Sequence, residues 1–226
     1  MTLCLFLTAV SAEDDRHMAR LLDRLDDTER ARAARFMFDR DRRTYAAAHA
    51  LLRHALDRLA GPRPWRFVTG AYGKPRLDPP CNNIRFSLSH TDGLVAVALT
   101  QGQEVGVDVE AASRDPDEAA LASLALAPEE ITDLDSFADR RGRLLRLWVA
   151  KEALAKAIGE GLSLPLQQVV LRGDPPCVAA MPDGHGAASA WWLQTERHDA
   201  HWLGLAAGRA PSEVARTELA VADLIG

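Results

Sequence analysis

Two carboxylates in the segment "VGVDVE" (105–110) have a spacing that suits metal-assisted chemistry on phosphates. Side chains of a strand alternate between its faces, so the three valines share one face and Asp108 and Glu110 share the other. Their Cα atoms then lie roughly 6–7 Å apart. A divalent cation between them relieves their repulsion, and oxygen-only ligands favour Mg²⁺. The alternative is an exposed strand face that happens to be acidic, and the strand alone leaves both interpretations open.

A second set of charges lies on the predicted helix in "LWVAKEALAKAIGEGLSLPL" (147–166). At 100° per residue, Trp148, Glu152 and Lys156 fall within one narrow stripe. Glu152 and Lys156 could instead form only a solvated i,i+4 ion pair, worth about 0.3–0.5 kcal/mol. Lys151 lies on the apolar stripe among leucines, where it must reach water along its stem or find a partner.

Two further segments carry groups that suit an anion. In "YGKP" (72–75), a glycine before Lys74 lets the backbone approach an anion while the ammonium group supplies charge. In "SLSH" (87–90), His90 follows apolar residues on one strand face, so a hydrogen-bonded core histidine is the alternative. Together with the carboxylates, these segments favour a metal that shares its phosphate ligands with the protein.

The elements that must position these residues indicate an α+β protein with a long helix and several strands in each half. Helices are expected over 39–61, 128–134 and 143–158, with charge-rich helical sequence over 16–35 and an Asp-, Ala- and Pro-rich loop after 110. A faint repeat links "DGLVAVAL" (92–99) with "DAHWLGLAA" (199–207), which suggests two similar halves. Strands are expected at the N-terminus, where a signal peptide is the less favoured interpretation, and over 65–68, 84–90, 94–100, 104–110, 168–172, 190–196 and 202–207.

Composition limits the possible function classes. The chain has 226 residues, 47% hydrophobic and 26% charged, which is typical of a soluble globular protein of one large or two small domains. The formal net charge of −5 argues against nucleic-acid binding. Residues 1–86 nevertheless hold 16 Lys and Arg against 11 Asp and Glu, which suggests a local anion site. Three separated cysteines and no membrane-length apolar run predict a cytoplasmic protein with free thiols.

The motifs occur in an order and at separations that resemble the Sfp-type 4′-phosphopantetheinyl transferases. They are "YGKP" (72–75), "FSLSH" (86–90), "VGVDVE" (105–110) and "WVAKEALAKAIGEGLSLPL" (148–166). The resemblance implies two similar α+β halves related by a pseudo-twofold, with the active site in the cleft between them. It also implies a boundary that separates an N-terminal half (1–102), on the coenzyme side, from a C-terminal half (103–226) that carries the carboxylates.

The resemblance further implies the reaction and its residues. A serine hydroxyl of an apo carrier protein attacks the phosphorus next to pantetheine in coenzyme A, and adenosine 3′,5′-bisphosphate leaves. Glu152 is the candidate base, acting directly or through a water, as well as a metal ligand. By resemblance, Mg²⁺ binds Asp108, Glu110 and Glu152, Lys156 contacts the pyrophosphate, and the other phosphate contacts are Lys74, Ser89, His90 and Arg43, with Arg53 and Arg32 as weaker candidates. Thr44 departs from the family, which often has a basic residue at this position.

Two other function classes remain as alternatives. A Mg²⁺-dependent phosphohydrolase would use the same carboxylates with water as the nucleophile, and a non-catalytic module would bind coenzyme A without turnover. The carrier could belong to fatty-acid, polyketide or nonribosomal peptide synthesis. It could dock on the Arg-rich residues 30–43 or on the apolar residues of 111–141, namely Leu121, Leu124 and Leu126. A monomer is expected, without nucleic-acid or membrane partners, because one chain supplies both sides of the cleft.

Overall fold

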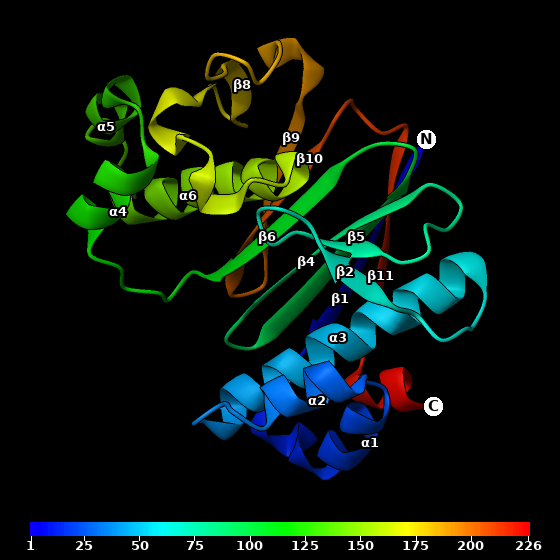
Figure 1. The fold of residues 1–226 in the computed structure, drawn as a ribbon. Helices are drawn as coiled ribbons and strands as arrows, with labels where there is room; N and C mark the ends of the chain where they lie inside the picture. Colours follow the sequence, from blue (N-terminus) through cyan, green and yellow to red (C-terminus); the bar gives the residue numbers. More distant parts are fainter.

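Two β-sheets lie face to face at the centre of the molecule, and one long helix covers the outer face of each (Figure 1). The computed structural model describes all 226 residues. The first sheet has the order β11-β1-β5-β4 and is covered by α3 (Asp39–Ala60). The second has the order β6-β10-β9 and is covered by α6 (Arg140–Ile158). The strands of the first are β1 (Thr2–Ala9), β4 (Ile84–Thr91), β5 (Leu94–Gln101) and β11 (Glu213–Leu219); those of the second are β6 (Val105–Ala111), β9 (Trp192–His198) and β10 (His201–Ala207).

The two halves repeat one topology. Each has a strand, then a long helix, then a hairpin whose second strand pairs with the first strand. This order is β1, α3, β4, β5 in one half and β6, α6, β9, β10 in the other, and all of these pairings are antiparallel. The faint sequence repeat falls on the equivalent strands β5 and β10. The expected α+β fold of two similar halves is therefore confirmed.

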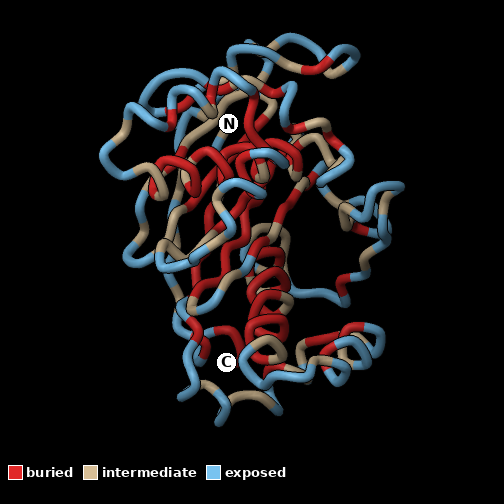
Figure 2. The backbone as a smooth tube through the Cα atoms, turned by 90° about the vertical axis from the view of Figure 1, so that its left-hand side faces the viewer, coloured by how far each residue is buried: buried red, intermediate tan, exposed pale blue.

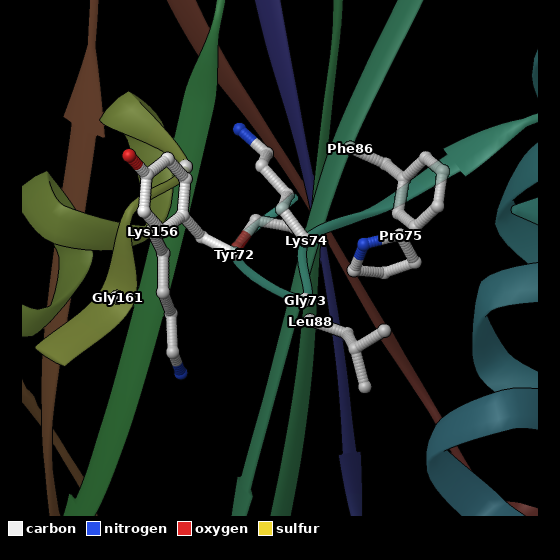
Figure 3. Close-up of a pocket in the computed structure, with 10 residues that line it drawn as sticks. Tyr72, Gly73, Lys74, Pro75, Phe86, Leu88, Lys156 and Gly161 are labelled. Atoms are coloured by element: carbon white, nitrogen blue, oxygen red, sulfur yellow. The ribbon is translucent and has the colours of Figure 1, made fainter. Parts of the chain in front are cut away.

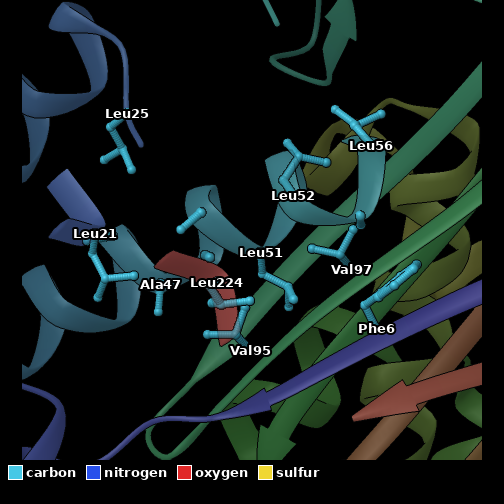
Figure 4. Packing of buried hydrophobic residues seen from close by; sticks show 14 of the residues in the cluster. Phe6, Leu21, Leu25, Ala47, Leu51, Leu52, Leu56, Val95, Val97 and Leu224 are labelled. Atoms are coloured by element: carbon cyan, nitrogen blue, oxygen red, sulfur yellow. The ribbon is translucent and has the colours of Figure 1, made fainter. Parts of the chain in front are cut away.

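The alternation of side chains along the strands builds the core between the sheets. Leucines and alanines from β1 and β5 meet the valines of β6 and the leucines of β10 in one buried cluster. The opposite faces of the strands pack against α3 and α6 in two larger clusters. Figure 4 shows Leu51 of α3 close to Val95 of the first sheet, with Leu224 from the C-terminal end beside them. Burial is concentrated on the strands and the long helices, and the loops are exposed (Figure 2).

Smaller elements complete each half, and several were not predicted. A helix, α4, forms inside the stretch expected to be a loop, where the Asp117 carboxylate accepts a hydrogen bond from Ala120 N and caps its start. None of the helices is long and apolar enough to cross a membrane. The smaller elements are α1 (Met18–Asp23), α2 (Asp27–Ala33), β2 (Phe67–Thr69), β3 (Pro75–Leu77), α4 (Glu118–Ala125), α5 (Pro128–Leu134), β7 (Val170–Arg172) and β8 (Cys177–Ala180), with short 3₁₀ turns between them.

The C-terminal end of the chain returns to the first half. Strand β11 pairs in parallel with β1 over seven residues, and the 3₁₀ turn Val221–Ile225 packs against α3. The sequence did not indicate this strand, because its side chains are mostly exposed or half-buried and no apolar face marks it. The division of the chain between residues 102 and 103 stays a prediction. The structure adds that residues 213–225 lie with the first half.

Candidate active site

Three predicted residues form one hydrogen-bonded cluster where the two halves meet. Lys156 Nζ of α6 donates to Asp108 Oδ1 of β6 at 2.7 Å and to Ser89 Oγ of β4 at 2.8 Å. Ser89 Oγ in turn donates to Asp108 Oδ1 at 2.8 Å. Asp108 is only 6% exposed. Residues from three elements far apart in the sequence are thus joined around one buried carboxylate.

Serine side chains bridge the edges of the two sheets. Ser87 Oγ accepts a hydrogen bond from Val107 N at 3.1 Å, and Ser89 Oγ accepts one from Val109 N at 3.4 Å. Strands β4 and β6 make no backbone ladder with each other, so these hydroxyls satisfy donors on an otherwise open strand edge. The serines of the "SLSH" segment therefore hold the halves in register beside the cluster.

Glycines allow α6 to lie directly on its sheet. A Cβ atom at Gly106 of β6 would lie 1.8 Å from the carbonyl oxygen of Ala153, and one at Gly204 of β10 would lie 2.4 Å from that of Val149. The helix backbone occupies the space that these side chains would need. This close approach carries Glu152 and Lys156 to the face of β6 that holds Asp108 and Glu110, as strand alternation predicted.

The carboxyl group of Glu152 is buried without a full set of hydrogen-bond donors. Its Oε1 is buried without a hydrogen-bond partner. Burial, followed by the negative charges of Asp108 and Glu110, raises its pKa to about 7, although Lys156 opposes the shift. A carboxyl group with this pKa can accept or release a proton near neutral pH.

Glu110 is held at the end of β6 by two donors. The indole N–H of Trp148 donates to Glu110 Oε1 at 3.1 Å, and Arg114 donates to the same oxygen. Burial and the Asp108 charge raise the pKa of Glu110, and Arg114 counteracts them. No protein group donates to Oε2, so this oxygen can accept a further ligand.

The donor set of the three carboxylates fits a hard divalent cation. Asp108 Oδ2 and Glu152 Oε1 are both buried and unpartnered, and each of the three groups is close enough to influence another's charge. A cation would offset this accumulation of negative charge. The groups do not yet converge as one complete set of ligands, since no three His, Cys, Asp or Glu side chains lie within reach of a single ion. Lys156 occupies the other Asp108 oxygen.

Lys74 lies beside the cluster and spans the two halves. Its Nζ donates to Glu104 Oε2 at 2.8 Å, to the Ala157 carbonyl at 3.0 Å and to the Val105 carbonyl at 3.3 Å. It lines a cavity of about 220 Å³ together with Tyr72, Lys156 and residues of β4. Figure 3 shows the Lys74 ammonium group directed away from that of Lys156. Burial lowers the pKa of Lys74, and Glu104 opposes this shift.

His90 lies at the end of β4, near positive groups from the helical layer. His90 is exposed to solvent. Partial desolvation, followed by the charges of Lys156, His49 and Arg32, lowers its pKa. The positive charges of Lys156, His49 and Arg32 are thus close enough to act on the His90 imidazole.

The predicted arginines differ in what they already contact. Arg43 is buried and paired with Asp15, and Arg53 is buried and paired with Glu29, with Nη2 to Oε2 at 2.8 Å. Arg32 is exposed and makes no ion pair, and its guanidinium lies 5.4 Å from the centre of the Tyr45 ring. Of the three arginines, Arg32 is therefore the one whose guanidinium group is not already paired with a carboxylate.

Of the two outcomes expected for Lys151, the structure shows the second, because the ammonium group finds a partner inside the protein and does not reach water. Lys151 is fully buried, and its Nζ pairs with Glu130 of α5 and donates to the carbonyls of Ala125, Leu166 and Val169. Glu130 also accepts hydrogen bonds from Ala127 N and Leu171 N. Sequence analysis missed Glu130, whose signal was only an acidic residue in the first turn of a short helix.

The apolar candidates for docking are mostly part of the core. Leu121 and Leu126 are buried, whereas Leu124 of α4 is 51% exposed. In the Arg-rich stretch 30–43, the neighbouring residues Met37 and Phe38 are exposed. One apolar residue on the first surface and two on the second are therefore accessible.

Comparisons with known proteins agree with the motifs. Residues 104–206 match the model of the 4′-phosphopantetheinyl transferase superfamily. The 4′-phosphopantetheinyl transferase HetI of Nostoc sp. is 31% identical over 75% of this chain and 72% of its own. The 4′-phosphopantetheinyl transferase Sfp of Bacillus subtilis is 32% identical over 53% of this chain and 54% of its own. Among solved structures, the holo-[acyl-carrier-protein] synthase of Neisseria meningitidis has a TM-score of 0.38 at 21% identity, over 46% of this chain and 95% of its own.

Proposed function

The chain belongs to the 4′-phosphopantetheinyl transferase superfamily and is an enzyme of that class, and from this premise we propose that it transfers the 4′-phosphopantetheine arm of coenzyme A to a serine of an apo carrier protein. The observation that carries this proposal is the cluster of Asp108, Ser89 and Lys156 beside the uncompensated Glu152. It combines carboxylates able to hold a cation with an ammonium group able to meet a phosphate. Both lie at the seam between the halves.

The proposed reaction forms a bond between the carrier serine oxygen and the phosphorus next to pantetheine. The bond from that phosphorus to the bridging oxygen of the pyrophosphate breaks, and adenosine 3′,5′-bisphosphate leaves. The serine proton passes to Glu152, directly or through a water. Lys156 offsets the negative charge that develops on the transferred and leaving phosphates.

We further propose that Asp108, Glu110 and Glu152 hold Mg²⁺ when coenzyme A is bound. The ion would supply a positive charge to the pyrophosphate oxygens. The Lys156 ammonium group could then donate either to Asp108, as it does here, or to a coenzyme phosphate. Ser89, His90 and Arg32 are proposed as further phosphate contacts. Lys74 and Arg43 would have to exchange their present partners to join them.

The setting of the reaction is also a proposal. We propose a cytoplasmic monomer whose carrier is acidic around the modified serine. The exposed Met37 and Phe38 in the Arg-rich stretch 30–43 support docking there, and Leu124 supports docking on α4. A carrier of fatty-acid, polyketide or nonribosomal peptide synthesis fits this chemistry equally.

Release of adenosine 3′,5′-bisphosphate separates the transferase from its alternatives. We expect purified protein with coenzyme A and Mg²⁺ to release it only when an apo carrier is present, and EDTA to abolish release. Lys156→Gln should lower the rate about 10²-fold or more, because it removes charge stabilisation at the leaving group. The exposed Arg197→Gln serves as a control far along the chain from the cluster and should stay active. Release without a carrier would favour the phosphohydrolase, and binding without release would favour the non-catalytic module.

A further inference from the structure

Trp148 lies on the same helix stripe as Glu152 and Lys156, one turn before the first and two before the second. Its side chain is buried in the core cluster beneath α6, so it offers nothing to a substrate directly. Its only hydrogen bond joins Nε1 to Glu110 Oε1, at 3.1 Å. We propose that Trp148 is a positioning residue, which fixes one oxygen of Glu110 and leaves the other for the cation.

The two donors to Glu110 differ in rigidity. Arg114 follows β6 in a turn, and its side chain is 40% exposed. An exposed, long side chain is ordered only weakly by a single ion pair. Trp148 is set by the packing of α6 on the sheet and has few rotatable bonds. The indole N–H therefore determines where the Glu110 carboxylate lies, and Arg114 adds charge to the same oxygen.

The contact with Trp148 restricts the side chain of Glu110. Glu110 lies at the end of β6, opposite Trp202 of β10, and its backbone is already fixed by the sheet. Only its side-chain torsions remain free, and Trp148 restricts them. Groups that orient a metal ligand through a hydrogen bond typically affect metal affinity by about 10- to 100-fold. A tryptophan that served only to fill the core would have no such effect.

The test removes the N–H and keeps an aromatic ring. This inference rests on the proposed metal site, so binding is measured separately from transfer. Trp148→Phe and the wild type are titrated with Mn²⁺ in the presence of coenzyme A, and free Mn²⁺ is read from its electron paramagnetic resonance signal. We expect about tenfold weaker Mn²⁺ binding in Trp148→Phe. Trp191→Phe is the matched control: it is partly buried against the same cluster without contacting Glu110, and it should bind as the wild type does.

Transfer kinetics supply a second readout. In Trp148→Phe the Mg²⁺ concentration for half-maximal activity should rise, while kcat at saturating Mg²⁺ stays within about threefold of the wild type. Equal Mn²⁺ affinity in Trp148→Phe and the wild type would overturn the positioning role even if transfer is normal. A wild type that binds Mn²⁺ but modifies no carrier would instead count against the proposed function and leave the affinity comparison decisive for Trp148.

A measurement on the wild type covers the case in which Trp148→Phe does not fold. Tryptophans labelled with ¹⁵N in the indole ring are followed by NMR during addition of Mg²⁺ with coenzyme A. The Trp148 indole signal, assigned by elimination from Trp→Phe variants at the other four tryptophans, should shift as Mg²⁺ binds the Glu110 carboxylate. An indole spectrum in which that signal stays in place at saturating Mg²⁺ would refute the proposal.

Discussion

The three lysines of the chain have three different environments. Lys156 reaches Asp108 and Ser89, Lys74 joins the two halves through Glu104 and two carbonyls, and Lys151 is buried with Glu130. Two of them lie on neighbouring turns of α6 yet point to opposite sides of the helix. Only Lys156 has its ammonium group at the carboxylate cluster.

The buried pair of Lys151 and Glu130 predicts a large loss of stability when one partner is removed. In Lys151→Met, Glu130 stays buried without a counter-charge, and three carbonyls lose their donor. We expect the free energy of unfolding to fall by about 3–5 kcal/mol, as measured by urea denaturation. Adding Glu130→Gln should restore part of this loss. A single variant as stable as the wild type would show that the pair does not hold α5 against α6.

At the same scale, sequence periodicity predicted which side chains share a face better than it predicted the buried ion pairs. Asp108, Glu152 and Lys156 come together in the structure for this reason, and their roles in a reaction stay predictions. Glu130 and the ion pair of Arg53 were not found, because they depend on which loops and helices meet in space. The ion pairs of Arg43 and Arg53 depend on tertiary packing in the same way, whereas Arg32 is exposed and makes no ion pair.

At the scale of elements, the contact of α6 with its sheet predicts that Gly106 tolerates no side chain. A Cβ at this position would overlap the helix backbone, which cannot shift without moving Glu152 and Lys156. Gly106→Ala should destabilise the protein by more than about 3 kcal/mol or prevent folding, since overpacking against backbone cannot be relieved by a rotamer change. Gly208→Ala is the matched control, because its nearest neighbour is a side-chain atom at 4.0 Å. Thermal unfolding compares the two, and equal melting temperatures would contradict the close packing.

The contact of α2 with α3 predicts a loss of stability in acid. Burial alone would raise the pKa of Glu29, but hydrogen bonds and charges from His49 and Arg53 outweigh it and lower the pKa to about 2. Ionised Glu29 therefore contributes stability above its usual pKa of 4.5, and this is lost as pH falls from about 4.5 to 2. The contribution is about 3 kcal/mol.

Urea unfolding at several pH values checks this linkage. Glu29→Gln should be less stable than the wild type at pH 7, and the difference should shrink towards pH 2. The exposed Asp27 pairs with Arg30 on the same helix, and Asp27→Asn should leave the pH profile unchanged. A difference between Glu29→Gln and the wild type that is constant with pH would contradict the role of its charge.

The sequence predicted the elements whose apolar periodicity or end signals are strong, whatever their length. They include the long helices α3 and α6, the short helix α5 and strands β4, β5 and β6. Strands β3, β8 and β11 are short or mostly solvent-exposed, so partner strands rather than their own side chains specify them. Helix α4 was masked by its loop-like flanks.

At the scale of the whole molecule, β11 makes the two halves unequal. In the repeated topology, β4 corresponds to β9 and β6 corresponds to β1. The seam where the edge strands β4 and β6 meet would therefore have a counterpart where β9 and β1 meet. Strand β11 pairs with β1 along that edge and forms the ion pair Arg216–Glu196 with β9. The second seam is therefore filled by the chain itself, and the carboxylates and Lys156 have no counterpart there.

Because β11 fills the seam between β9 and β1, only the seam between β4 and β6 can hold a ligand. We therefore expect one coenzyme site per chain. Isothermal titration of the protein with coenzyme A and Mg²⁺ should give a stoichiometry of about one, with a mass in solution equal to that of one chain. Lys156→Gln should weaken this binding, since it removes a proposed phosphate contact. Two sites per chain, or one site per two chains, would contradict the asymmetry that β11 imposes.

Transfer of the phosphopantetheine arm is tested most directly by the intact mass of a carrier protein after incubation with the enzyme. Purified protein, coenzyme A, Mg²⁺ and a panel of apo acyl and peptidyl carriers are mixed, and each carrier is weighed by mass spectrometry. We expect a gain of one phosphopantetheine arm on at least one carrier, abolished by EDTA and by Glu152→Gln. Unchanged mass on every carrier, from a folded protein that still binds coenzyme A, would contradict the transferase assignment.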